Sequence, residues 1–205
     1  ASAVRLVAVA KSFAADVVLA AADAGIRDIG ENRAQELKEK IAVVGDRVRW
    51  HFVGHLQTNK VRNVVGRAQL LHSVDRYGLA EAVARRAGSM GIEQDVLVEV
   101  NVGGETSKHG VEPGRAIALA EEIAALPGVS LRGLMTIPPA TRDAEGARPF
   151  FQELAALRDR LVSSVPTASE LSMGMSRDFE IAIEEGATIV RVGEAVFGPR
   201  STKVT

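Results

Sequence analysis

The sequence alternates, from one end to the other, between short apolar runs and longer stretches of helical composition. Such an order is typical of parallel strands joined by helical crossovers, which are right-handed and leave few topologies open. The expected strands are residues 5–10, 26–30, 49–53, 69–73, 95–101, 131–136, 170–172 and 188–192. The expected helices are residues 14–24, 31–44, 56–65, 77–87, one that begins at Pro113, 143–165, one after Ser176 and a truncated one after Phe197. Eight repeats predict an α/β fold, a (β/α)8 TIM barrel in a single domain over residues 1–205, with an open doubly wound sheet as the alternative.

Composition limits the classes of binding partner and the cellular compartment that we expect for this protein. Apolar residues make up 46% of the chain and aromatic residues 4%, so the core must be built from Ala, Val, Leu and Ile, as is usual for parallel sheets under helices. The formal net charge is −1 and the basic residues are dispersed, which argues against a nucleic-acid partner. There is no cysteine, no signal peptide and no apolar run near the ~20 residues of a membrane span. We therefore expect a cytoplasmic protein without membrane or nucleic-acid partners, and the closed barrel with separated charges favours a monomer.

Two glycine-containing turns near the end of the sequence have the character of an anion site. The first, residues 173–176, lies between a strand that ends at Ser172 and a helix that Ser176 is suited to cap. The second follows the last strand and contains Gly193. A helix start presents unpaired N–H groups, and a TIM barrel keeps its phosphate site after its last two strands. Ser176 alone could simply cap its own helix, but two such turns favour a phosphate site.

Lys11 directly follows the first strand, so its side chain begins at the rim of an apolar interior. Desolvation there favours the neutral amine, which attacks carbonyl groups, whereas the alternative is a lysine whose ammonium group reaches water. An amine of this kind, with a phosphate site across the barrel mouth, indicates an aldehyde that carries a phosphate. The sequence therefore predicts pyridoxal 5′-phosphate (PLP) as the ligand.

Polar residues stand at nearly every strand end, where a TIM barrel keeps its chemistry. The residues at these positions are Lys11, Asn32, His55, Ser73, Asn101, Met135, Ser172 and Arg191. Asn32 is as well suited to cap a helix as to face a ligand. His51 and His55 are four residues apart, but Gly54 interrupts them and His51 falls within a strand, so we expect no metal site. The loop 103–110 stays open between a cover for a ligand and a plain surface loop.

Five motifs carry a family resemblance: VAVAK (7–11), GENRAQE (30–36), HFVGHLQTNK (51–60), LSMGMSRD (171–178) and RVG (191–193). Together they resemble the pyridoxal-phosphate homeostasis protein family, whose members are single-domain relatives of the N-terminal barrel of alanine racemase. The resemblance runs along the whole chain. It implies a TIM barrel that holds PLP as an internal aldimine on Lys11.

The same resemblance implies the other contacts of the cofactor. Phosphate contacts are implied at Ser176 and Gly193, and Arg191 would face the pyridine nitrogen. The full set of expected cofactor-binding residues is Lys11, Asn32, His55, Ser73, Met173, Ser176, Arg191 and Gly193. Family members are regarded as PLP carriers or regulators of vitamin B6 and amino-acid balance without an established reaction. We therefore expect no catalytic residue, and PLP-requiring apoenzymes are candidate partners.

The chain departs from the family pattern in two places. Glu194 stands where members often carry a small hydroxyl residue, so a phosphate contact there must come from the backbone N–H, with the carboxylate turned away. A helix that usually precedes the first strand is absent, and we expect an N-terminal segment to be missing. Two other functions stay open: a PLP-dependent amino-acid racemase, and a PLP-independent barrel enzyme in which Lys11 forms a Schiff base with a phosphorylated sugar.

Overall fold

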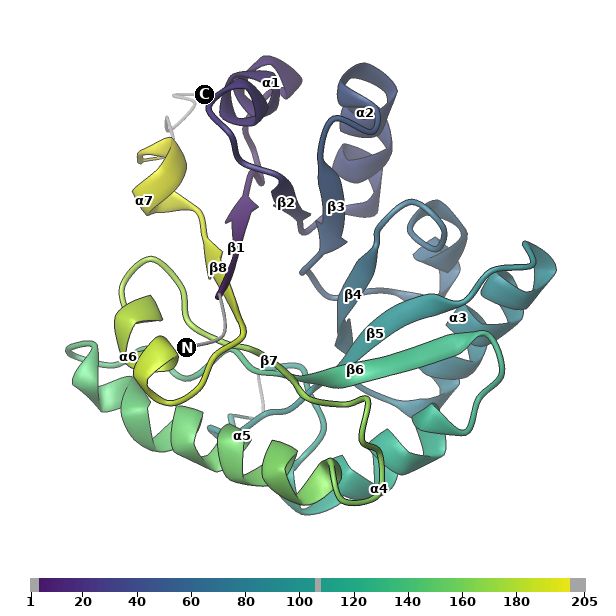
Figure 1. Cartoon of the computed structure of the whole chain (residues 1–205), viewed down its shortest axis with the longest axis vertical. Helices are drawn as coiled ribbons and strands as arrows, with labels where there is room; N and C mark the ends of the chain where they lie inside the picture. Colours follow the sequence, from purple (N-terminus) through teal and green to yellow (C-terminus); the bar gives the residue numbers. More distant parts are fainter. Residues whose placement is uncertain (1–3, 106–107, 200–205) are drawn as a thin grey trace.

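The computed structural model describes residues 4–105 and 108–199 and shows a closed barrel of parallel strands (Figure 1). The strands are β1 (Arg5–Val9), β2 (Asp28–Glu31), β3 (Arg49–Phe52), β4 (Leu70–Val74), β5 (Gln94–Glu99), β6 (Val129–Met135), β7 (Glu170–Ser172) and β8 (Ile189–Val192). They pair in sequence order, and β8 returns to pair with β1, where Val7 lies opposite Arg191. This closure confirms the predicted (β/α)8 barrel and excludes the open doubly wound sheet.

The helices lie around the outside of the barrel in Figure 1. They are α1 (Ala15–Asp23), α2 (Ala34–Val44), α3 (Tyr77–Ser89), α4 (Pro113–Ala124), α5 (Arg148–Leu161), α6 (Phe179–Glu184) and α7 (Glu194–Phe197), with 3₁₀ turns η1 (Thr58–Asn63) and η2 (Glu145–Ala147). In α5 the buried residues Phe151, Leu154, Leu157 and Leu161 recur every three or four positions, which is the spacing that buries one face of a helix. The main core therefore lies between strands and helices.

The barrel interior holds a smaller apolar cluster. Its buried members are Val7, Leu70, Leu97, Met135 and Ile189. Strand side chains alternate between the two faces of the sheet, so the other inward positions complete this interior. Several of those positions carry polar side chains that are nevertheless buried, among them His51, His72 and Arg191. A polar interior of this kind has to be hydrogen-bonded, and its contacts are described below.

Four expected elements differ in detail from the observed ones. Residues 56–65 form only the 3₁₀ turn η1, and the helix expected from residue 31 begins at Ala34 because Glu31 ends β2. The long helix 143–165 is shorter, with η2 leading into α5. The last helix, α7, ends at Phe197 instead of following it, and its start coincides with the end of the glycine turn. The expectation of a missing segment before β1 falls outside the described residues and stays a prediction.

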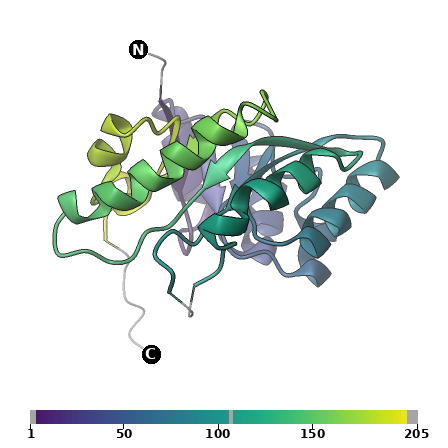
Figure 2. The same cartoon turned by 90° about the horizontal axis from the view of Figure 1, so that it is seen from below.

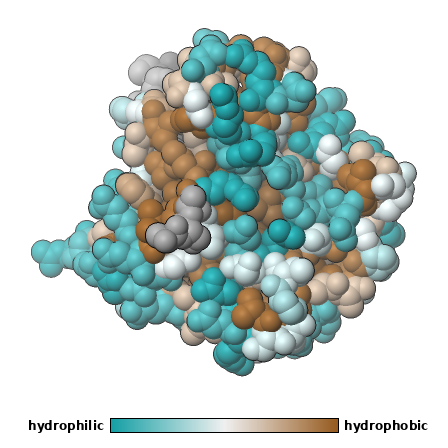
Figure 3. Space-filling model, viewed as in Figure 1, coloured by the Kyte–Doolittle hydropathy of each residue, from teal (hydrophilic) through white to brown (hydrophobic). Residues whose placement is uncertain are grey.

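The two ends of the barrel differ in their surroundings. Figure 2 shows the loop between β5 and α4 extending from the side opposite to the start of β1. The face seen in Figure 3 is mainly polar, with apolar atoms gathered over the region where Figure 1 draws β1 and β8. Leu6 in β1 is 41% exposed, so the described helices cover the outside of β1 incompletely. No helix within the described residues is long and apolar enough to cross a membrane.

Candidate functional site

Lys11 stands in a tight turn immediately after β1 and is half-buried. The Ala10 N–H donates to the Gly30 carbonyl at 2.9 Å, so the strand end is still tied to β2. Ser12 has a φ of 70°, in the left-handed region that non-glycine residues rarely occupy. Its N–H donates to Glu36 Oε2 on α2 at 3.0 Å. The turn that carries Lys11 is therefore fixed on both sides of the lysine.

A buried ion pair supports this turn from below. Lys40 of α2 donates to the carbonyl of Ala10 at 2.7 Å and pairs with Glu31, and both charged side chains are almost fully buried. Burial raises the pKa of Glu31 to about 6, although the hydrogen bond and charge of Lys40 act to lower it. Lys40 thus places a charge-assisted hydrogen bond on the residue that precedes Lys11.

The predicted phosphate residues Ser176 and Gly193 meet directly. Ser176 Oγ accepts hydrogen bonds from the N–H groups of Gly193 and Ala195, each at 3.3 Å. Gly193 immediately precedes α7, so this hydroxyl lies against the start of that helix. A Cβ on Gly193 would lie 3.2 Å from the carbonyl oxygen of Val9. The two glycine turns therefore form one site, and it lies beside the end of β1.

Two expectations about this site are wrong. Ser176 does not cap the helix that follows it: α6 begins at Phe179, and Asp178 instead accepts the Met175 N–H at 2.6 Å. The turns also do not lie across the barrel mouth from Lys11, because β8 pairs directly with β1. The reason is barrel closure, which brings the last strand beside the first. Glu194, expected to turn away, is exposed as the first residue of α7.

Arg191 lies almost fully buried at the third position of β8, 4% exposed. Its guanidinium donates to Ser172 Oγ at 2.7 Å and to the Thr136 carbonyl at 2.8 Å. Burial lowers the pKa of Arg191 to about 10, which leaves the group cationic at neutral pH. The predicted cation at the barrel mouth is therefore held by neutral oxygen acceptors.

Three further predicted residues have different surroundings. Asn32 is not a helix cap, since Arg33 occupies that position of α2. The Oδ1 of Asn32 is buried and has no hydrogen-bond partner among the described residues. The Ser73 hydroxyl donates to the Gly54 carbonyl, so it supports the loop after β3. Met173 is fully buried within the main core. If Met173 acts on the cofactor, it can do so only by packing beneath the pocket.

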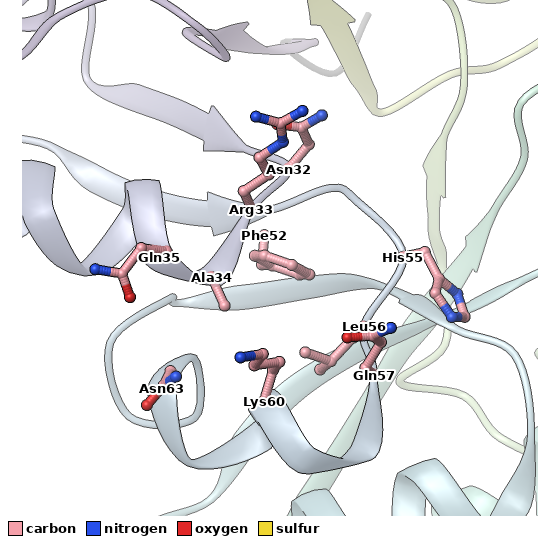
Figure 4. A pocket seen from close by; sticks show the side chains of 10 residues that line it. All are labelled: Asn32, Arg33, Ala34, Gln35, Phe52, His55, Leu56, Gln57, Lys60 and Asn63. Atoms are coloured by element: carbon pink, nitrogen blue, oxygen red, sulfur yellow. The ribbon is translucent and has the colours of Figure 1, made fainter.

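A cavity of about 300 Å³ lies between the start of α2 and η1 (Figure 4). Its lining residues are Asn32, Arg33, Ala34, Gln35, Phe52, His55, Leu56, Gln57, Lys60 and Asn63. In Figure 4 His55 projects away from the other lining side chains, while the amine of Lys60 points toward the side of the cavity formed by α2. The volume is at the lower end of the range for small-molecule pockets.

His55 belongs to a second group of titratable residues at the barrel mouth. Its ring stacks on that of His109 with centroids 3.6 Å apart and an angle of 12°, and its Nδ1 lies 3.7 Å from Asp75 Oδ2. Burial and then the charge of His109 lower the pKa of His55. Ligand atoms of the three residues lie within 4.8 Å of one another. Nearly parallel rings direct their nitrogen lone pairs along parallel planes, however, so both imidazoles cannot point at one ion in this arrangement.

Several residues of the site were not predicted. His51 contacts both Asp28 and His72 inside the barrel, and Glu99 is buried at the end of β5. Burial and the charge of Asp75 raise the pKa of Glu99 to about 7, although Arg191 acts to lower it. These residues could have been found from the sequence because each is a charged or imidazole side chain within an otherwise apolar strand. His51 was seen only as a possible metal ligand, and its position inside β3 separates it from His55.

Comparison with known proteins gives consistent matches along the chain. The family described as "Alanine racemase, N-terminal domain" matches residues 1–201. A pyridoxal phosphate homeostasis protein of Aquifex aeolicus (strain VF5) is 48% identical over 198 residues, 96% of this chain and 87% of that protein. The human protein of the same name is 41% identical over 210 residues, 96% of this chain and 76% of that protein.

Solved structures extend the match to three dimensions. PipY of Synechococcus elongatus PCC7942 with PLP bound is 36% identical, with a TM-score of 0.86 over 95% of this chain and 92% of that chain. The same protein without PLP is 37% identical, with a TM-score of 0.89 over 95% of this chain and 93% of that chain. An alanine racemase of Clostridium difficile 630 in complex with cycloserine shares the fold, with a TM-score of 0.78 at 16% identity over 98% of this chain and 56% of that chain. The chain therefore belongs to the pyridoxal phosphate homeostasis protein family, on the barrel of the alanine racemase N-terminal domain.

Proposed function

We propose that this protein binds PLP covalently through Lys11 and acts in vitamin B6 and amino-acid homeostasis. The observation that carries the proposal is the site formed by Ser176, Gly193 and Ala195 beside the turn of Lys11. PLP has a phosphate at one end and an aldehyde at the other, so an anion site next to an amine matches both. The name of the relatives and the PLP-bound PipY structure support the same ligand.

The residues present fit this cofactor. The N–H groups of Gly193 and Ala195 converge on one oxygen, Ser176 Oγ, and backbone N–H groups at such a point also suit a phosphate oxygen. Gly193 lacks the Cβ that would crowd Val9. The unpartnered Oδ1 of Asn32 is a buried acceptor that a polar ligand could satisfy.

Each residue then has a defined role. Bound PLP would supply an aldehyde that condenses with an amine with loss of water, and Lys11 would provide that amine. Ser176 and the N–H groups around Gly193 hold the phosphate. Arg191 offers a donor to the pyridine nitrogen, while Asn32, His55, Ser73 and Met173 complete the pocket. Because Arg191 stays cationic, it would keep the pyridine nitrogen of bound PLP unprotonated, which would weaken the ring as an electron sink.

We propose that the protein carries PLP without turning over a substrate. Racemisation needs a proton donor or acceptor on each face of the substrate carbon, and Lys11 can serve only one face. The only tyrosine of the sequence, Tyr77, opens α3 and is 43% exposed. The alternative, an amino-acid racemase, would need a second base from elsewhere. We further propose that residues 1–205 act as one domain, as a cytoplasmic monomer that serves PLP-requiring apoenzymes.

The absorption spectrum of the protein tests the binding proposal. Addition of PLP should produce an absorption band of the lysine-bound cofactor. Borohydride reduction should remove this band and make the attachment permanent, and peptide mass mapping should place the label on Lys11. Lys11→Ala should abolish this band, whereas Lys60→Ala and Lys108→Ala, two other lysines near the barrel mouth, should keep it. A label on Lys60 or Lys108 in the unchanged protein would contradict the assignment.

A separate assay tests the absence of turnover. The PLP-loaded protein is incubated with L-alanine in deuterated water, and both the Cα proton and the enantiomer ratio are followed. Exchange or racemisation at about 1 s⁻¹ or faster, the lower end for ordinary enzymes, would favour the racemase.

A further inference from the structure

A chain of buried polar side chains crosses the interior of the barrel from β2 to β8. Its contacts are His51 Nε2 with Asp28 Oδ1 at 2.9 Å, His51 Nδ1 with His72 Nε2 at 3.0 Å, His72 Nδ1 with Ser172 Oγ at 2.8 Å, and Arg191 with Ser172 Oγ at 2.7 Å. All five residues are buried, and each is at most 5% exposed. Polar groups buried this deeply are costly unless each is satisfied, so the chain is a built feature of the barrel.

The acceptor end of the chain is Asp28. Arg49 donates to both of its carboxylate oxygens, from Nε at 2.8 Å and from Nη2 at 2.6 Å. Burial raises the pKa of Asp28, but the hydrogen bonds from Arg49 and His51 outweigh it and hold the pKa below the usual carboxyl range. Asp28 is therefore an ionised carboxylate that can only accept. It follows that His51 carries a hydrogen on Nε2.

The donor end of the chain is Arg191, which has no acceptor atom. It donates to Ser172 Oγ, so the Ser172 hydroxyl hydrogen is directed to His72 Nδ1. Burial holds the pKa of His72 well below its ordinary value, so this ring is neutral. With Nδ1 accepting, His72 carries its hydrogen on Nε2 and donates it to His51 Nδ1.

The resulting order of donation is Arg191 to Ser172, to His72, to His51 and to Asp28. The reverse polarity would make His72 donate to Ser172 Oγ, which already accepts from Arg191. The Ser172 hydroxyl hydrogen would then have no acceptor among its contacts with the described residues, which is unfavourable in a dry interior. The two ends therefore fix both imidazole rings as neutral Nε2–H tautomers.

This order determines what Arg191 presents to the barrel mouth. Two of its N–H groups are used inward, on Ser172 Oγ and on the Thr136 carbonyl, and the Thr136 hydroxyl is itself tied to the Val100 carbonyl at 2.7 Å. Neither acceptor carries a charge, so the plane of the guanidinium is fixed while its positive charge remains available. Loss of His72 would leave Ser172 free to rotate and to release Arg191.

We propose that His72 and His51 are positioning residues for Arg191, acting through Ser172 and anchored by Asp28 at the amino end of β2. The proposal extends the function proposed above, because it concerns the donor that faces the cofactor nitrogen. The chain reaches the opposite end of the barrel, where the Arg49 side chain is 55% exposed. A substitution near that end should therefore alter the binding of the cofactor, although the substituted residue does not contact the cofactor.

The protein without cofactor tests the hydrogen-bond order independently of PLP. The sequence has four histidines, so His→Gln variants assign the imidazole nitrogen signals in ¹⁵N-resolved NMR spectra. His51 and His72 should each be a single neutral Nε2–H tautomer at pH 7, while His55 and His109 exchange with water. A protonated ring or an Nδ1–H tautomer at His51 or His72 would overturn the proposal.

The loaded protein tests the effect on Arg191. His72→Leu should weaken PLP binding about tenfold, the loss expected if the hydrogen bond from the charged Arg191 to the cofactor is lost, and should shift the absorption band of the bound cofactor. His72→Gln keeps one donor and one acceptor and should restore most of the affinity and the band position. Leu70→Ala, in the apolar cluster on the same strand, is the control for a general loss of stability.

The outcomes separate the two proposals. An unchanged band and affinity in His72→Leu, or an equal shift in a Leu70→Ala variant of matched stability, would overturn the positioning role. Failure of the unchanged protein to bind PLP would overturn the proposed function and the cofactor role of the chain together. In that case the NMR result would still decide whether the hydrogen-bond order exists.

Discussion

The two sides of the barrel mouth are held by different kinds of interaction. On the side of β8, β1 and β2, buried groups fix the site: Lys40 holds the strand end before Lys11, and the interior chain holds Arg191. In the loops that follow β3 and β5, the described contact is exposed, with His55 stacked on His109. The difference means that the proposed attachment point, Lys11, and the proposed partner of the ring nitrogen, Arg191, are both held by buried contacts.

The largest expected effect comes from removing the anchor of the first side. Lys40→Met leaves Glu31 buried without its cation, and breaking such a pair costs about 3–5 kcal/mol. The loss in the free energy of unfolding should be larger at pH 8 than at pH 5, because Glu31, with a pKa of about 6, takes up a proton at the lower pH. Urea denaturation at both pH values measures this. Lys38→Met, exposed on the same helix, is the control, and equal stability of the two variants would contradict the anchoring role.

The next effect concerns Glu99, which is buried although it lies on the second side. Its pKa rises from 4.5 to about 7 on folding, so the folded protein binds its proton more tightly than the unfolded chain does. The stabilisation is complete below pH 4.5 and is lost as the pH rises through 7, by up to about 3 kcal/mol. Glu99→Gln should remove this part of the pH dependence.

Denaturation of the unchanged protein and of Glu99→Gln at pH 5 and pH 8 isolates the effect of Glu99. The same comparison with Glu122→Gln, exposed on α4, corrects for a general loss of charge. If Glu99→Gln keeps the full decline in stability between the two pH values, the raised pKa is wrong.

An intermediate effect is expected at Ser176 on the first side. Ser176→Ala removes the hydroxyl that gathers the N–H groups of Gly193 and Ala195, and should weaken PLP by about 1–2 kcal/mol, or roughly tenfold. Ser163→Ala, exposed after α5, should not change the affinity. Titration with pyridoxal, which lacks the phosphate, sharpens the test. Equal losses for PLP and pyridoxal would show that Ser176 does not contact the phosphate.

The smallest effect is expected at His109. His109→Ala removes an exposed stacking partner, so PLP affinity should change by less than about threefold. The pKa of His55 should rise, because the charge of His109 acts to lower it, but should stay below its ordinary value because burial remains. An NMR titration of His55 measures this. A large loss of PLP would mean that the second side is as essential as the first.

Local patterns were sufficient to predict the barrel and part of the site. Alternating apolar runs predicted the strands, and Lys11, Ser176 and Gly193 follow strand ends where a barrel collects its ligands. The hydrogen-bonded chain could not be predicted in this way. His72 and Ser172 are one hundred residues apart in sequence, so their contact depends on the closure of the whole barrel. The same closure explains why the proposed phosphate site lies beside Lys11 and not opposite it.

Two errors concern helix bounds and helix caps. Residues 58–63 form a 3₁₀ turn where a longer helix was expected. Ser176 has the chemistry of a helix cap, but its hydroxyl is used by α7, which lies later in the chain. A propensity scale cannot distinguish a cap for the next helix from a partner for another one.

The close contact between Gly54 and Asn32 limits how the entrance can diverge among relatives. A Cβ at position 54 would lie 2.6 Å from the Cα of Asn32, so no other residue fits without moving the backbone. The loops after β2 and β3 therefore have to change together under natural drift or in engineering. An insertion in either loop would displace both Asn32 and His55. The loops after β5 and β6 are coupled in a similar way, because a Cβ on Gly103 would lie 2.3 Å from the Pro139 side chain and Lys108 donates to the Pro138 carbonyl.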